Sequence, residues 1–234
     1  MKSAGFGRAL LEIVVIFVGI LTALLADSWW EDRQARHREA EYLVSLAEDF
    51  AENETRLTRA ISIADTSSAA ASALLTVGLG GNELETDSLR SLFSRLRRLP
   101  TFEPVTKTYD NILGAGDILT LRDAPLRAEL ADFQSRLTLM NVVQETQERQ
   151  FVSIQLPYFI EHLDFVGTLN LRNDGVEAPE VIPSHFAAVR TVIGTREFRN
   201  WVAVRLDWSD DLQNQHIRVL ERVKAVQGLV RPTS

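Results

Sequence analysis

Glu12 is the residue whose type and position most suggest a special role, because it lies inside an otherwise apolar run. A carboxylate in such a run is costly to bury and is by default a functional candidate. Arg8 lies four residues earlier, so the two side chains share one helix face and can pair near a membrane surface. We therefore interpret Glu12 as the local partner of Arg8. The alternative is a contact with a cation on another membrane helix.

A second group of polar residues surrounds Gly116 and contains types that can line a polar pocket. Its members are Tyr109, Asp110, Asp117, Asp123 and Arg127. The structural interpretation is favoured: Asp117 and Asp123 cap helices, and Arg127 pairs with a nearby acid. Gly116 lies between two short predicted helices, where we expect it to adopt a positive φ.

No other pattern indicates a catalytic or metal site. The histidines are scattered and lack zinc-ligand spacing: His37, His162, His185 and His216. The acids Asp207, Asp210 and Asp211 fall on a predicted helix and read as a solvated face. Neither a glycine-rich phosphate loop nor a Gly-x-Ser-x-Gly elbow occurs. We therefore expect no cofactor and no enzymatic activity.

Composition narrows the partners and the number of domains. The chain has 234 residues, of which 45% are hydrophobic, so it can bury one sizeable core. A net charge of -7 leaves no basic surface for phosphates, which argues against nucleic acid as a partner. The chain has no cysteine, and this fits either a reducing cytosol or a periplasmic domain without disulfides.

An apolar segment over residues 9–26 predicts a transmembrane helix, because its length approaches the roughly 20 residues that cross a bilayer. Asp27, Trp29 and Trp30 follow it, and tryptophans are enriched at membrane interfaces. A cleaved signal peptide is the alternative, but the segment lacks a small-x-small cleavage site and its helical pattern continues beyond it. We expect a single-pass protein of the cell inner membrane, with the N-terminus inside and the C-terminal domain outside. The bilayer is thus the first expected partner.

The rest of the chain shows helical periodicity and no hairpin pattern. We predict an all-α fold: an anchor over residues 1–30, a juxtamembrane helix over 31–77, and a helical bundle over 78–234 that packs with it. A helix from residue 8 to 77 would be roughly 100 Å long, so we expect a bend or a break within it.

Long, coiled-coil-like helices are predicted in the C-terminal part. One opens at Asp123, and its apolar face is predicted to run through Leu126, Leu130, Phe133, Leu137 and Met140. Phe151, Ile154 and Tyr158 continue this face, and a kink is expected at Pro157. Gln144 and Gln147 make the middle of that face polar. Residues 163–183 are predicted as a loop, and Ser184 and Thr195 as caps of the last two helices.

Two stretches resemble an uncharacterised bacterial family, a domain of unknown function whose members begin with one transmembrane helix. The first is EIVVIFVGILTALLADSWWEDRQARHREAEYLVSLAEDF, residues 12–50, and the second is TYDNILGAGDILTLRDAPLRAEL, residues 108–130. The positions that match the family's pattern are Glu12, Gly19, Asp27, Trp29, Tyr42, Tyr109, Gly116, Asp123, Leu126 and Arg127. The resemblance implies an anchor and a helical fold, and it implies no activity.

These observations favour a membrane-anchored interaction or scaffold protein whose partner is a second copy or another membrane protein. Gly19 and Ala23 form a small-x-x-x-small pair of the kind that lets two membrane helices approach each other. The alternative is an extracytoplasmic domain that senses a ligand and acts through a partner, for which the polar Gln144 and Gln147 are the support. An enzyme is the least favoured of the three.

Overall fold

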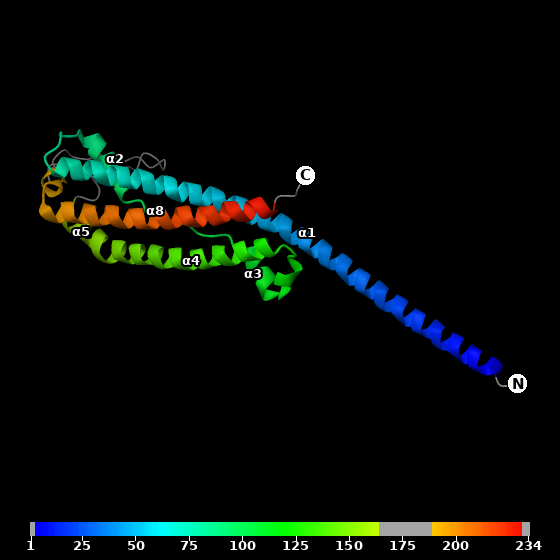
Figure 1. The fold of residues 1–234 in the computed structure, drawn as a ribbon. Helices are drawn as coiled ribbons and strands as arrows, with labels where there is room; N and C mark the ends of the chain where they lie inside the picture. The colour runs from blue at the N-terminus through cyan, green and yellow to red at the C-terminus, as the bar shows by residue number, and fades with distance from the viewer. Residues whose placement is uncertain (1–2, 164–188, 231–234) are drawn as a thin grey trace, which may run out of the picture.

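Three long helices form the body of the protein: α1 (Ser3–Gly78), α4 (Ala124–Gln150) and α8 (Arg196–Val230). The computed structural model describes residues 3–163 and 189–230, and side chains from residue 15 onward. α8 packs against both α1 and α4, and it runs antiparallel to them (Figure 1). No strand occurs in the described part, which confirms the predicted all-α bundle.

α1 is one continuous helix of 76 residues, so of the predicted bend or break it shows a bend and no break. Its sequence explains the continuity, because no glycine or proline lies between Gly19 and Gly78. Figure 1 shows a gentle change of direction where the free N-terminal segment enters the bundle. Gradual curvature of this kind keeps every backbone hydrogen bond and needs no helix-breaking residue.

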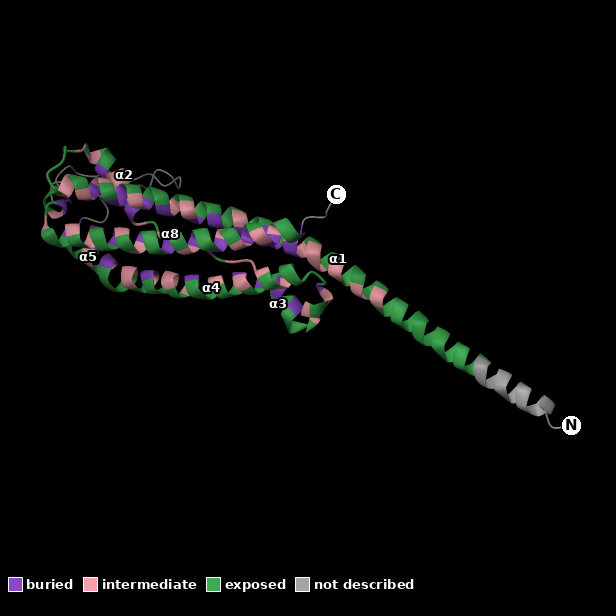
Figure 2. Cartoon of the chain, in the orientation of Figure 1, coloured by how far each residue is buried: buried purple, intermediate pink, exposed green. Residues whose placement is uncertain are grey.

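The buried residues of the long helices recur at alternating steps of three and four, which is the spacing of helices packed side by side. On α1 the buried positions include Leu46, Phe50, Asn53, Leu57, Ala60, Ala64, Ser67, Ala71 and Leu74. On α8 they are Phe198, Val202, Arg205, Ser209, Leu212, His216, Val219, Val223, Val226 and Val230. Figure 2 shows these buried positions inside the bundle, whereas residues 15–31 of α1 are exposed.

The core has two apolar clusters separated by polar side chains. One cluster lies near the point where α1 leaves the bundle and includes Phe50, Phe133 and Val219. The other lies at the far end and joins α1 and α8 to α2 (Thr86–Leu96), with Phe93 at its centre. Between the clusters α8 carries buried Arg205 and Ser209.

Shorter elements connect the long helices. They are α2, α3 (Lys107–Gly114), the 3₁₀-helical η1 (Asp117–Thr120), the π-helical η2 (Phe151–Gln155) and α5 (Leu156–His162). Residues 189–193 are also helical. As predicted, Thr195 caps α8, because its Oγ1 accepts a hydrogen bond from the Phe198 backbone N–H at 3.2 Å. Ser184 and nearly all of the predicted loop 163–183 lie outside the described residues.

The π-helical turn shifts the buried face of the helix that follows. The sequence predicts Phe151, Ile154 and Tyr158 on this face, but the buried residues are Gln155 and Phe159. A π-helical turn holds one residue more than an α-helical turn, so the apolar register moves forward by one position. The predicted face was therefore wrong by one residue, although the chain does change direction between α4 and α5 (Figure 1).

Candidate functional site

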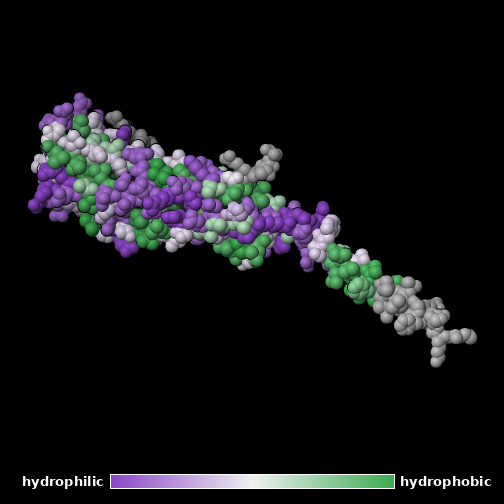
Figure 3. All heavy atoms as spheres, viewed as in Figure 1, coloured by the Kyte–Doolittle hydropathy of each residue, from purple (hydrophilic) through white to green (hydrophobic). Residues whose placement is uncertain are grey.

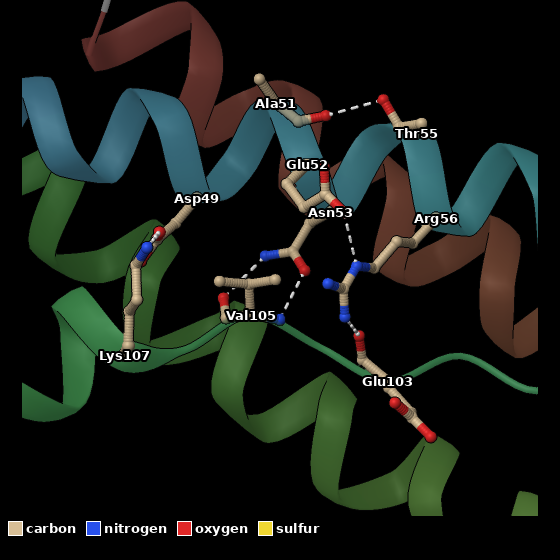
Figure 4. Close-up of polar contacts among 9 residues, drawn as sticks. All are labelled: Asp49, Ala51, Glu52, Asn53, Thr55, Arg56, Glu103, Val105 and Lys107. Atoms are coloured by element: carbon tan, nitrogen blue, oxygen red, sulfur yellow. Dashed lines mark hydrogen bonds and ion pairs between the residues drawn. The ribbon is translucent and has the colours of Figure 1, made fainter.

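Asp49, Asn53 and Arg56 lie on one face of α1 and hold the chain that precedes α3 (Figure 4). This chain, residues 97–106, is called the extended segment below. Asn53 lies at the centre and is fully buried. Its Nδ2 donates to the Val105 carbonyl at 2.9 Å, and its Oδ1 accepts from the Val105 N–H at 2.7 Å. One amide side chain thus satisfies both backbone groups of Val105.

Asp49 lies one turn before Asn53 and caps the start of α3 from another helix. Its Oδ2 accepts from the Thr108 N–H at 3.1 Å, and its Oδ1 pairs with the Lys107 ammonium at 3.2 Å. The first N–H groups of a helix lack intrahelical partners and favour a negative charge, so a buried carboxylate there is stabilised.

Arg56 and Gln144 fix the same extended segment further upstream. Arg56 Nη1 donates to the Glu103 carbonyl at 3.0 Å, and its Nε contacts Glu52 at 2.8 Å. From the side of α4, Gln144 Oε1 accepts from the N–H of buried Phe102 at 2.9 Å. The segment is therefore fixed between α1 and α4 by side chains that bind its backbone.

A second set of contacts, the neck cluster, joins α1 to the chain around η1 where α1 leaves the bundle. The neck cluster consists of Asp32, Arg38, Glu39, Tyr42, Asp117 and Arg122. Tyr42 donates to Asp117 at 2.8 Å, and this hydrogen bond raises the pKa of the Tyr42 hydroxyl. The Arg122 N–H donates to Glu39 at 2.6 Å, while the Arg122 guanidinium contacts Asp32 and Glu39.

The residues predicted around Gly116 do lie near one another, but mainly in structural roles. Gly116 has a φ of 74°, as predicted, and Asp123 caps α4 by accepting from the Leu126 N–H at 3.5 Å, also as predicted. Asp117 caps no helix, because its carboxylate is held by Tyr42 and Arg38. The acid partner predicted for Arg127 is wrong, since its guanidinium donates to the Leu121 carbonyl.

Tyr109 belongs to the core rather than to a pocket. It is 6% exposed and packs in the cluster around Phe50, and burial raises the pKa of its hydroxyl. In this region the side-chain hydrogen bond is made by Tyr42, which donates to Asp117. Tyr42 lies in residues 12–50 and Asp117 in residues 108–130, the two stretches that carry the family resemblance. The structure thus brings those two stretches together at the neck cluster.

The candidates of the N-terminal segment are separate from this region. Asp27 and Trp29 are exposed, and the Arg33 guanidinium lies over the Trp29 ring at 5.7 Å. Gly19 has open space around it. The side chains of Arg8 and Glu12 lie outside those described, so their pairing stays a prediction.

Sequence reasoning missed two buried ionisable residues on α8. Arg205 is 1% exposed, its Nη2 donates to the Arg98 carbonyl at 3.0 Å, and burial lowers its pKa to about 10. His216 is fully buried beside the Phe102 ring, and burial lowers its pKa to about 4. Both occupy positions of the three-and-four spacing of α8, and this spacing was the available signal for their burial.

The glutamines that suggested a ligand site are used in contacts between elements. Gln144 binds the Phe102 backbone, and Gln147 Nε2 donates to the Trp208 carbonyl of α8. Asp207, Asp210 and Asp211 are exposed, as the solvated-face interpretation predicts. Among the side chains described, those of residues 15–163 and 189–230, no three acids or histidines lie together as metal ligands would.

α1 is long and apolar enough to cross a membrane, and no other helix of the described part is. The large apolar residues between positions 15 and 25 are all between 46% and 65% exposed, so nothing in the described chain covers them. They are Val15, Ile16, Phe17, Val18, Ile20, Leu21, Leu24 and Leu25.

Comparisons with protein-family models, curated proteins and solved structures give no match to this chain. The family resemblance of residues 12–50 and 108–130 therefore stays a prediction.

Proposed function

We propose that the protein is a membrane-anchored interaction module that holds a helical bundle at the surface of the inner membrane. The observation that supports this most is the uncovered apolar stretch at the start of α1, where every large side chain from residue 15 to 25 is exposed. Contiguous exposed apolar surface of this kind is rare on soluble monomers and indicates a membrane or protein contact. Its place on a single helix that is long enough to span favours lipid.

The anchor and the bundle are parts of one rigid element in this proposal. α1 continues without a break from the exposed stretch into the core at Leu46 and Phe50. The neck cluster ties the chain around η1 to the same helix at Asp32, Glu39 and Tyr42. A rigid link of this type suits a protein that presents its surface to a partner at a fixed distance from the bilayer.

The polar contacts favour an interaction role over ligand sensing or catalysis. Asp49, Asn53 and Gln144 bind backbone groups of the extended segment. These side chains order the fold and do not converge on a shared cavity. The proposed partner is a second copy or another membrane protein, and in this proposal the bundle lies outside and the N-terminus inside.

Fractionation of the full-length protein tests the proposal. We expect the intact chain to stay with the membranes in high salt and after an alkaline wash, and to be released by detergent, because lipid burial of an apolar helix does not depend on salt. Recovery of the intact chain in the soluble fraction without detergent would refute the proposed anchor.

A further inference from the structure

The connection between α3 and η1 forms an exposed apolar tip, which we define as residues 113–119. Leu113 is 47% exposed and Leu119 is 78% exposed, the highest exposure among the large hydrophobic residues described. The only charged residue of the tip is Asp117, which is held by Tyr42 and Arg38. The tip therefore presents leucine, alanine and glycine to its surroundings.

The tip lies at the end of the bundle from which the exposed segment of α1 leaves. Figure 1 shows α3 and the chain after it beside this part of α1. In Figure 3 a hydrophobic patch lies at the same place, next to the hydrophilic part of α1 that carries the neck cluster. The neck cluster fixes the tip to α1, so the tip must follow any inclination of the anchor.

Helix geometry gives the distance from the apolar segment to the part of α1 that Arg122, three residues after Leu119, contacts. Asp32 lies six residues after Ala26, roughly 9 Å along the axis at the rise of an α-helix, and Glu39 lies roughly 20 Å along. Arg122 spans this interval, because its side chain reaches Asp32 while its N–H binds Glu39. An anchor tilted by about 20°, the average for transmembrane helices, brings one side of the bundle closer to the bilayer.

We propose that the tip is a second membrane contact, with α1 tilted so that Leu113 and Leu119 lie in the headgroup region of the bilayer. This inference rests on the proposed anchor, because the anchor places the bilayer at this end of the bundle. Continuity with the anchor makes lipid the occupant.

Single-cysteine labelling tests the inference in the full-length protein, since the chain has no cysteine of its own. Leu119→Cys carries an environment-sensitive fluorophore in vesicles that contain anionic lipid and nitroxide-labelled lipid. Leu79→Cys is the matched control, because Leu79 is 70% exposed in the turn that ends α1 at the opposite end of the bundle. Val18→Cys reports separately on insertion of the anchor.

We expect a shift to shorter emission wavelength and lipid quenching at positions 18 and 119, and neither effect at 79. Quenching at 18 with a water-like, unquenched signal at 119 would overturn the tip contact and leave the anchor intact. A shift at 119 without lipid quenching would show that protein covers the tip, which also overturns the inference. Absence of quenching at 18 would instead refute the proposed anchor.

Discussion

α1 contains two apolar stretches with opposite surroundings. Residues 15–26 carry large apolar side chains that no described part of the chain covers. Residues 60–77 are rich in alanine and serine, and their face with Ala64, Ser67 and Ala71 is buried in the bundle. Small side chains let neighbouring helices approach closely. Large apolar side chains are unfavourable in water, so an apolar environment stabilises the exposed ones.

The difference shows that hydropathy alone does not identify the anchor. Both stretches are apolar in sequence, but burial inside the protein separates them. In the proposed arrangement, only the stretch without protein cover lies in lipid. The predictions below ask whether the two parts of α1 behave as differently as this comparison requires.

The largest difference in stability is expected when one phenylalanine in each of the two parts of α1 is replaced by alanine. Phe50 is 1% exposed and packs on Phe133 with ring centroids 4.8 Å apart, whereas Phe17 is 65% exposed. We expect Phe50→Ala to lower the free energy of unfolding of the bundle by about 3–5 kcal/mol, as for other buried phenylalanines. Phe17→Ala should leave it unchanged in urea titrations in detergent. Equal losses in the two variants would contradict the comparison.

His216 should make the bundle pH-sensitive. Its pKa is about 4 in the folded protein and 6.5 when unfolded, so between these values the unfolded chain binds the extra proton. Stability is therefore full above pH 6.5 and falls as the pH drops to 4, by about 3 kcal/mol in total.

Replacing the histidine should remove this dependence. We expect His216→Leu to flatten the change in unfolding free energy between pH 6.5 and pH 4.5, measured by urea titration. His37→Leu is the control, because the His37 side chain is 79% exposed. If His37→Leu flattened the profile and His216→Leu did not, burial of His216 would not be the cause.

Asn53→Ala should cost about 1–3 kcal/mol, because it leaves the N–H and the carbonyl of Val105 without their side-chain partner. The matched control is Asn214→Ala, since the exposed Asn214 amide donates to exposed Asp210 at 3.3 Å. Thermal unfolding of both variants measures the difference. An Asn53→Ala variant as stable as the control would mean that the hydrogen bonds between Asn53 and Val105 do not stabilise the fold.

Gly116→Val should have the smallest of these effects, about 1–2 kcal/mol, because a β-branched side chain is strained at a φ of 74°. Gly114→Val and Asp110→Ala serve as controls, since Gly114 does not share the positive φ and Asp110 is exposed. Identical melting temperatures for the three variants would show that the turn does not depend on its glycine.

The sequence was sufficient to predict elements with strong local signals. The spacing of Leu126, Leu130, Phe133 and Leu137 predicted the buried face of α4, and Asp123 predicted its start. The glycine at 116 predicted the left-handed turn. Each of these features depends on residues that are close in the sequence.

Features that depend on distant residues could not be predicted. Asp49 caps α3 across 59 residues, and Asn53 binds Val105 across 52, so neither partner is visible in a local pattern. The π-helical turn at Phe151–Gln155 adds a residue that periodicity does not reveal. The buried Arg205 lies at a core position, but its hydrogen bond to Arg98 appears only in the folded chain.

The most direct test of the account asks which apolar stretch of α1 holds the protein in the membrane. A fragment over residues 31–234 keeps the neck cluster and the stretch 60–77 but lacks residues 15–26. We predict that this fragment is soluble without detergent and strongly helical by far-UV circular dichroism, while the full-length protein resists alkaline extraction. A folded fragment that remained alkali-resistant in the membrane fraction would contradict the account.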